Sequence, residues 1–240
     1  MNIRSIVKKY ISAHTINQIK SFQPSFLFRK VSYSQCGEDL IIKYIFNNLG
    51  IHKPRFLDIG AHHPSNLSNT YIFYQNGSSG VNIEPDPQLF SYIKKCRPRD
   101  ININVGITDQ RGTLDFYVMT SSTLNTFSLV EAKNAESEKV KIDKVIQIVV
   151  IPINDILKEH FSHVELDFLS LDVEGLDMRI LQSFDFSICR PKVICVETIT
   201  YSEKRDGKNI KEIEQLLIEK GYFAYANTHI NTIFVDSAVW

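Results

Sequence analysis

From Arg55 onward, short apolar runs alternate with segments of helical character, and this alternation narrows the possible folds more than any other feature of the sequence. Residues 56–59, 80–83 and 101–105 are predicted strands, and residues 69–75 and 87–95 are predicted helices between them. Strands joined by helices in this order are typical of a parallel sheet with crossover helices. The first half of the chain therefore predicts one βαβαβ unit.

The rest of the chain returns to the same pattern after an interruption. Residues 112–119 and 145–151 are predicted strands around a polar stretch, 120–144, and residues 154–160 are a predicted helix, so this region is expected to be an insertion beside the sheet. Strands at 167–171 and 193–196 follow, with helices at 177–183 and 210–220, and 223–226 with 232–235 form a hairpin. We expect an α/β fold: a mostly parallel twisted sheet with an antiparallel C-terminal edge and helices on both faces.

Composition excludes several classes of protein. Among 240 residues, 43% are hydrophobic and 22% are charged, which is typical of a globular chain. The 27 basic and 27 acidic residues give a net charge of +0, which argues against a nucleic-acid partner. The sequence contains no CxxC pair of the kind found in zinc ribbons. It also contains no apolar stretch long enough to indicate a membrane span or a secretion signal. A reduced, cytoplasmic protein is expected.

Charge is uneven only at the N-terminus. The first 30 residues contain six basic residues and no acidic one, which leaves 21 basic and 27 acidic residues in the remainder. Loosely helical apolar spacing at Ile3, Ile6, Val7 and Tyr10 allows an amphipathic helix that lies on anionic lipid or grips an acidic substrate. Alternatively, this helix packs on its own domain or on a partner subunit. We expect residues 1–31 to be a basic arm and residues 32–240 to be the catalytic domain.

Polar residues follow five of the predicted strands. Ligands of open parallel sheets bind outside the carboxyl ends of the strands, near the point where strand order reverses. Asp, Asn and Gly at strand ends are also common turn formers, but five such ends on one rim favour a nucleotide-type pocket. The five segments are Asp58-Ile59-Gly60-Ala61-His62-His63, Glu84-Pro85-Asp86-Pro87, Asn104-Val105-Gly106, Asp172-Val173-Glu174-Gly175 and Glu197-Thr198.

The first two of these ends indicate the kind of cofactor. Gly60 permits close approach of a ligand to the backbone, and Glu84, 24 residues later, can accept hydrogen bonds from both ribose hydroxyls. A dinucleotide requires G-x-G-x-x-G for its pyrophosphate, but only one glycine is present after the first strand. S-adenosylmethionine has no phosphate and carries a sulfonium cation, so acids such as Asp58 and Asp172 suit it better. Asp58 alternatively caps the turn.

Several segments of the chain resemble the FkbM-type methyltransferases. The resemblance covers about residues 32–235, and it implies a Rossmann-like methyltransferase fold that uses S-adenosylmethionine to methylate hydroxyl groups, often on sugars or polyketide-derived products. In place of the usual Gly-x-Gly the chain has Gly60-Ala61-His62, and its first 30 residues match no part of the family. The segments are Tyr33-Ser34-Gln35-Cys36-Gly37-Glu38-Asp39, Phe56 to Pro64, Ser68-Asn69-Thr70, Gly80 to Pro87 and Phe168 to Gly175.

The resemblance also implies roles for single residues in cofactor binding. Glu84 would bind the ribose, Asn104 would lie near the adenine, and Gln35 and Glu38 would close the pocket from the N-terminal side. Glu38 alternatively begins a helix over residues 40–48, because acids are favoured in a first turn. The residues expected around the methionine part of the cofactor are Asp58, Gly60, Ala61 and Asp172.

Methyl transfer from a sulfonium is an in-line displacement, so the protein must position the acceptor, exclude water and remove the hydroxyl proton. Histidine and desolvated carboxyl groups can act as the base near neutral pH, although a single histidine is more often an ordinary loop residue. A divalent ion, Mg²⁺ or Mn²⁺, held by Asp172, Glu174 and Glu197 could acidify the hydroxyl instead. The candidates for proton removal are His62, His63, Asp172, Glu174 and, as second choices, Glu197 and His229.

These residues lead to one expected function and two alternatives. We expect an S-adenosylmethionine-dependent O-methyltransferase that acts on a sugar hydroxyl, in a nucleotide-sugar or a surface-glycan precursor. The alternatives are methylation of a non-sugar small molecule, and a non-catalytic cofactor-binding module docked on glycan-assembly enzymes. Polar groups beyond those needed to hold the cofactor favour the enzyme. No pattern in the sequence indicates an oligomeric state.

Overall fold

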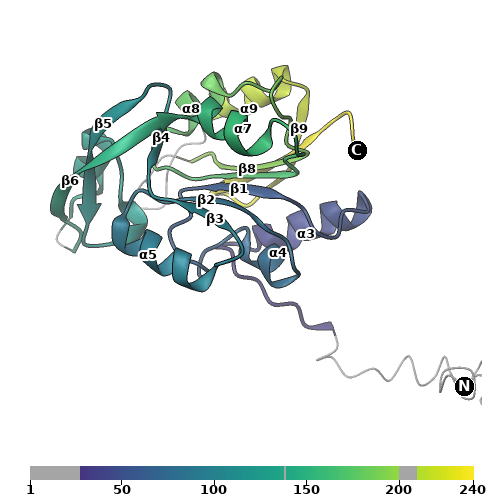
Figure 1. The fold of residues 1–240 in the computed structure, drawn as a ribbon, viewed down its shortest axis with the longest axis horizontal. Helices are drawn as coiled ribbons and strands as arrows, with labels where there is room; N and C mark the ends of the chain where they lie inside the picture. The colour runs from purple at the N-terminus through teal and green to yellow at the C-terminus, as the bar shows by residue number, and fades with distance from the viewer. Residues whose placement is uncertain (1–27, 138, 200–209) are drawn as a thin grey trace, which may run out of the picture. The chain divides into compact units, whose positions relative to one another are not determined.

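The computed structural model describes residues 28–137, 139–199 and 210–240, and residues 32–240 form one compact unit (Figure 1). The predicted amphipathic helix of the basic arm lies outside the described residues. None of the described helices is long and apolar enough to cross a membrane.

A seven-stranded sheet forms the centre of this unit. Its strand order is β3-β2-β1-β7-β8-β10-β9. The first five strands in this order pair in parallel, whereas β10 pairs antiparallel with both β8 and β9, so the predicted parallel sheet with an antiparallel C-terminal edge is confirmed. The strands are β1 (Phe56–Ile59), β2 (Gly80–Ile83), β3 (Ile101–Ile103), β7 (Phe168–Leu171), β8 (Val193–Glu197), β9 (Tyr222–Asn227) and β10 (Asn231–Asp236).

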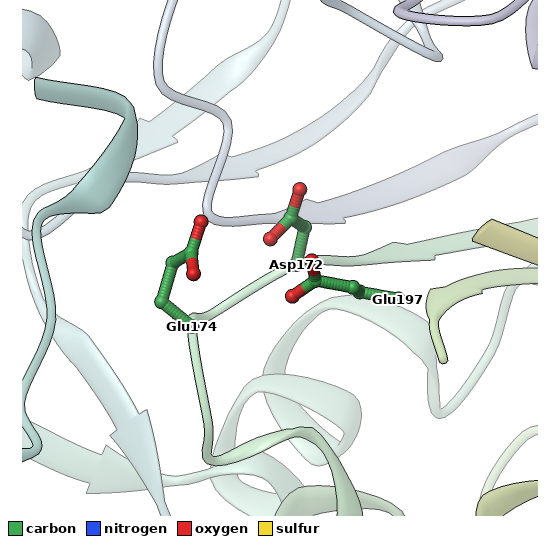
Figure 2. Close-up of side chains that lie close together, drawn as sticks. All are labelled: Asp172, Glu174 and Glu197. Atoms are coloured by element: carbon green, nitrogen blue, oxygen red, sulfur yellow. The ribbon is translucent and has the colours of Figure 1, made fainter. Parts of the chain in front are cut away.

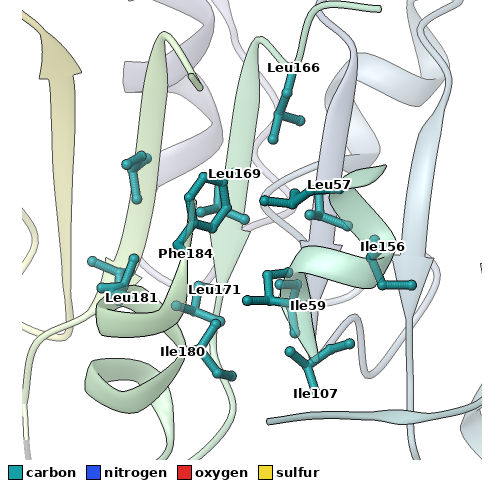
Figure 3. Packing of buried hydrophobic residues seen from close by; sticks show 14 of the residues in the cluster. Leu57, Ile59, Ile107, Ile156, Leu166, Leu169, Leu171, Ile180, Leu181 and Phe184 are labelled. Atoms are coloured by element: carbon teal, nitrogen blue, oxygen red, sulfur yellow. The ribbon is translucent and has the colours of Figure 1, made fainter. Parts of the chain in front are cut away.

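Helices cover both faces of this sheet, as expected (Figure 1). Side chains of a strand alternate between faces, so Phe56 belongs to one apolar cluster and Leu57 to the other. The Leu57 cluster packs under three helices, and Figure 3 shows its central residues. Those helices are α7 (Ile153–Phe161), α8 (Asp177–Ser183) and α9 (Lys211–Glu219); the opposite face carries α3 (Glu38–Asn48), α4 (Tyr71–Gln75) and α5 (Pro87–Cys96).

The ends of two helices reflect their local sequence. The Asp86 side chain accepts hydrogen bonds from the backbone of Gln88 and Leu89, and Pro87 occupies the first turn of α5, where its missing N–H costs nothing. Helix α3 begins at Glu38, two residues before the predicted start, so the alternative that this acid belongs to a first turn is confirmed.

The two predicted strands of the insertion join residues 106–108 in a second sheet, with strand order β4-β6-β5, whereas the predicted helix 154–160 packs on the main sheet as α7. The strands of the second sheet are β4 (Gly106–Thr108), β5 (Gly112–Met119) and β6 (Ile142–Pro152), and β5 has the predicted bounds. Strand β4 was not predicted, because three residues are too few to show alternation. Likewise, residues 120–144 contain the 3-10 helix η2 (Ser122–Leu124) and helix α6 (Leu129–Ala135), which their polar sequence does not indicate.

A buried arginine links β1 to the segment before α4. Arg97 is fully buried, and its guanidinium bonds Asp100 at 2.8 Å and the Thr70 hydroxyl at 2.9 Å. Thr70 in turn donates to the carboxylate of Asp58 at 2.6 Å. The guanidinium also lies 5.1 Å from the centre of the Phe56 ring. Arg97 therefore balances two buried acids, one of which lies in β1 directly before the turn at Gly60.

We predict that Arg97→Met lowers the free energy of unfolding by about 3–5 kcal/mol, because both acids then stay buried without a cation. Arg111→Met is the control, since Arg111 pairs with Asp155 at the surface and such pairs contribute about 1 kcal/mol or less. Urea unfolding of the two variants measures the difference. Equal losses would contradict a special role for the buried ion pair.

Candidate active site

A cavity of about 720 Å³ opens at the carboxyl ends of the central strands. The chain runs outward from β1 through β2 to β3 and then returns to β7 on the other side of β1, so strand order reverses between β1 and β7. This is where open α/β sheets bind ligands. Turns after β1, β2, β7 and β8 contribute to the wall, together with the N-terminal segment, the β9–β10 turn and the loop before α6.

The turns after β1 and β7 touch at Gly60. This glycine has φ of 81°, and a Cβ atom at its position would lie 1.8 Å from the carbonyl oxygen of Asp172. The Asp172 amide also donates to the Ile59 carbonyl at 3.1 Å. Only glycine satisfies both the left-handed conformation and the close approach. Gly60 thus brings the first turn and the Asp172 carboxyl into one cavity.

Glu84 is a buried carboxyl that lines the cavity at the end of β2. One of its oxygens accepts a hydrogen bond from the Asp86 amide and the other from the His62 amide, both at 2.8 Å. Burial raises the pKa of Glu84 to about 7, although these two bonds act in the opposite direction. A carboxylate has about four acceptor positions, so two remain for ribose hydroxyls. Glu84 and Gly60 together fit the ribose and backbone approach of S-adenosylmethionine.

Three carboxyl groups that line the cavity lie close to one another. One oxygen from each of Asp172, Glu174 and Glu197 lies within 4.8 Å of the other two, and Figure 2 shows the side chains pointing toward one another. None of the three accepts a hydrogen bond from a described residue. Burial, and then the charge of neighbouring acids, raises the pKa of each. The prediction that these three acids lie at the ends of neighbouring strands, close enough to act together, is confirmed.

Two histidines reach the cavity. His62 has φ of 51°, and its Nε2 lies 3.0 Å from the Ser122 hydroxyl. Burial, followed by the charge of His63, lowers the pKa of His62, so its ring is neutral and able to accept a proton at pH 7. His229 lines the cavity from the β9–β10 turn.

Backbone strain is concentrated around this cavity. Among the residues that the structure describes, four non-glycine residues have positive φ, and all four line the cavity. Such conformations persist where the surrounding structure holds them, and they cluster at functional sites. The four are His62, Leu67, Glu174 and His229.

Two predicted site residues, in β1 and in the turn that follows it, do not line the cavity. Asp58 shares the face of β1 that carries Phe56, and it accepts the Thr70 hydroxyl instead of lining the cavity or capping the turn. The Nδ1 atom of His63 accepts the amides of Ser65 and Asn66, so its ring is turned into its own loop. Neither side chain therefore lines the cavity, in contrast to the expectations that Asp58 contacts the cofactor and that His63 is a base.

Two further expectations need correction. Asn104 does not line the cavity, because its amide donates to the Glu84 and Pro85 carbonyls at 2.7 and 2.9 Å and so braces the turn after β2. Ala61 is buried behind Gly60, with its amide on the Ile83 carbonyl. Gln35 does line the cavity, as expected.

Glu38 holds one edge of the cavity without lining it. Its carboxylate accepts hydrogen bonds from the Cys36 amide, the Thr228 hydroxyl and the Asn231 amide group. Burial by itself raises the pKa of Glu38, but the hydrogen bonds outweigh it and the pKa lies below its ordinary value. This ionised side chain ties the segment of Gln35 and Cys36 to the turn that carries His229.

The loop before α6 supplies wall residues that the sequence did not reveal. Its polar sequence was interpreted only as part of an insertion, and the contacts that bring it to the cavity join residues far apart in the chain. The lining residues from this loop are Ser122, Thr123, Leu124, Asn125 and Phe127.

Comparison with known proteins identifies the family. The family described as methyltransferase FkbM domain matches residues 58–224, which is more than half of the chain. The chain belongs to the FkbM methyltransferase family. The resemblance found in the sequence is thus confirmed, and the protein is an S-adenosylmethionine-dependent methyltransferase.

Solved structures with similar folds share little sequence with this FkbM methyltransferase. A putative caffeoyl-CoA O-methyltransferase from Staphylococcus aureus is 11% identical, with 98% of this chain and 97% of that chain covered and a TM-score of 0.43. An O-methyltransferase from Bacillus cereus, solved in complex with SAH, is 10% identical, with 96% and 94% covered and a TM-score of 0.42. No curated protein matches the chain. The acceptor therefore has to be inferred from the cavity.

We predict that the ligand-free enzyme loses stability as pH rises from 5 to 8. The pKa of Glu84 is raised to about 7 and that of Asp177 to about 6, both by burial, while in the unfolded chain both lie near about 4. The stabilisation is therefore complete below about pH 4 and is lost as pH rises through about 6 to 7.

Urea unfolding across this pH range measures the slope, and Glu84→Gln should flatten it because the side chain at this position then carries no titrating proton. Comparing the variant with the parent cancels the opposite effect of His62, whose pKa is lowered by burial. Identical slopes would show that Glu84 binds no extra proton in the folded enzyme over this pH range.

Proposed function

We propose that this enzyme transfers the methyl group of S-adenosylmethionine to a hydroxyl of a sugar. The observation that carries the proposal is the group of Asp172, Glu174 and Glu197, which faces the same cavity as Gly60 and Glu84. Carboxyl oxygens accept hydrogen bonds, and a sugar presents several hydroxyl donors. The cavity therefore offers a cofactor side and an acceptor side.

On the cofactor side, Glu84 accepts the ribose hydroxyls and Gly60 lets the backbone approach the ligand. S-adenosylmethionine supplies a methyl group on a cationic sulfur, which the acid-rich wall favours electrostatically. Proximity and exclusion of water are then the main contributions of the protein to the displacement.

On the acceptor side, the carboxyl cluster removes the hydroxyl proton. A general base works best when its pKa lies near the working pH, and burial brings the pKa values of these acids up from their ordinary range. Glu174 is the leading candidate, and Asp172 and Glu197 share the proton with it. His62 and His229, which also line the cavity, are the second choice.

The residues that line the cavity favour binding of a sugar over binding of a phosphate group. Among the described residues that line the cavity, none is Lys or Arg, so a diphosphate would meet acids without a balancing cation. A surface-glycan precursor fits this wall, and a nucleotide-sugar fits it with the sugar inserted first. A non-sugar alcohol is the alternative acceptor.

A divalent ion at the same three carboxyl groups stays a prediction. Mg²⁺ and Mn²⁺ prefer oxygen ligands, and three oxygens within 4.8 Å of one another supply half of an octahedral set. Cytoplasmic location and membrane contact through residues 1–30 likewise remain predictions.

Methyl uptake by a panel of sugars, nucleotide-sugars and non-sugar alcohols tests the function. We predict that a sugar accepts the methyl group and that Glu174→Gln lowers kcat by about 100-fold or more, with little change in affinity for S-adenosylhomocysteine. The control is Glu165→Gln, because Glu165 is an exposed acid far from the cavity.

The same assays with EDTA, Mg²⁺ and Mn²⁺ separate the two ways of removing the proton. Activity that is indifferent to EDTA assigns the step to a protein base, and activity that EDTA removes and Mg²⁺ or Mn²⁺ restores assigns it to a metal. Methylation confined to non-sugar alcohols, or full activity of Glu174→Gln, would contradict the proposal.

A further inference from the structure

The loop Ser121–Phe127 forms one wall of the cavity, between β5 and α6. Its far end is fixed to β5, because Thr126 and Tyr117 exchange backbone hydrogen bonds at 2.9 and 3.2 Å. Within the loop, Thr123 and Leu124 line the cavity, and the Thr123 hydroxyl bonds only that of Ser121 among the described residues.

Two side chains of this loop bind the residues that hold Glu84. The Ser122 hydroxyl lies 3.0 Å from Nε2 of His62, and the Asn125 amide donates to the Asp86 carboxylate at 3.2 Å. His62 and Asp86 are the two residues whose backbone amides donate to the Glu84 carboxylate. Two series of hydrogen bonds, one through His62 and one through Asp86, thus connect the Glu84 carboxylate to the loop Ser121–Phe127.

A third contact joins the loop to the acceptor side. The Thr126 hydroxyl donates to the backbone carbonyl of Glu174 at 2.8 Å, and Glu174 has a strained φ of 51°. The loop therefore spans from the ribose-binding carboxylate to the carboxyl cluster. A shift of His62 or Asp86 would be transmitted to Thr123 and Leu124, which lie between the anchored residues.

We propose that Ser121–Phe127 is the acceptor-selecting wall of this methyltransferase and that Ser122 and Asn125 are positioning residues that couple it to the cofactor. The proposal rests on the proposed function, since it assigns the acceptor side of that cavity. Ribose hydroxyls on Glu84 fix the carboxylate, which fixes the two residues that anchor the loop. Binding of the cofactor thereby completes the acceptor site, and Thr123 and Leu124 select which hydroxyl compound fits.

Hydrogen exchange tests the coupling with S-adenosylhomocysteine as the probe and requires no acceptor. In the parent enzyme, saturating probe should slow exchange of the loop amides by about tenfold, as expected for a coupling of ordinary size. In Asn125→Asp the slowing should shrink to about twofold or less, because the donor to Asp86 is replaced by a repelling carboxylate. This variant retains the oxygen that accepts the Met119 amide.

Ser122→Ala is the second variant, and Ser121→Ala is its matched control, since the Ser121 hydroxyl bonds only within the loop among the described residues. Calorimetry confirms that each variant still binds the probe. The proposal is overturned if the probe leaves loop exchange unchanged in the parent enzyme, or if it slows loop exchange as much in Ser122→Ala and Asn125→Asp as in the parent enzyme and in Ser121→Ala. Neither exchange result depends on whether the acceptor is a sugar. The coupling can therefore be contradicted without contradicting the proposed function.

Discussion

The contact between the turns after β1 and β7 is the constraint on which the site depends. Gly60 lies so close to the Asp172 carbonyl that any side chain at this position would collide with it. Because of this contact, a residue of the first turn and a carboxyl more than 100 positions later face the same space. The pairing of β1 with β7 and the hydrogen bond from Asp172 to Ile59 maintain the arrangement.

Buried charge is arranged differently on the α4 side of the sheet and at the cavity. On the α4 side, Arg97 balances the buried acids Asp58 and Asp100. At the cavity, Glu174 and its neighbours have no cation among the described lining residues, so burial and mutual repulsion raise their pKa values. The cavity therefore favours positive charge and hydrogen-bond donors, which the sulfonium of the cofactor and, in the proposed function, the hydroxyls of an acceptor provide.

Most of the fold was predictable, because each buried parallel strand is a continuous apolar run and each crossover helix has its own period. The rim residues Gly60, Glu84 and Glu174 were predictable for the same reason: strand ends of a parallel sheet meet at one edge. Side-chain direction was not predictable. Asp58 and His63 are turned away by hydrogen bonds to their own surroundings.

The loop Ser121–Phe127 was not predicted to line the cavity, and the reason is also physical. Ser122 and Asn125 belong to a polar segment without apolar periodicity, and their partners, His62 and Asp86, lie 60 and 39 positions away. No local pattern encodes such contacts. Glu38 shows the same limit, because its role depends on Thr228 and Asn231 at the other end of the chain.

We propose that the cofactor binds in the cavity between the turns of β1 and β7 through Glu84. Calorimetric titration of S-adenosylhomocysteine into the parent enzyme and into Glu84→Ala measures the contribution of this carboxylate. We expect a loss of affinity of more than about tenfold, because hydrogen bonds to a charged group contribute about 1.5–3 kcal/mol each. Unchanged affinity in a folded Glu84→Ala variant would contradict it.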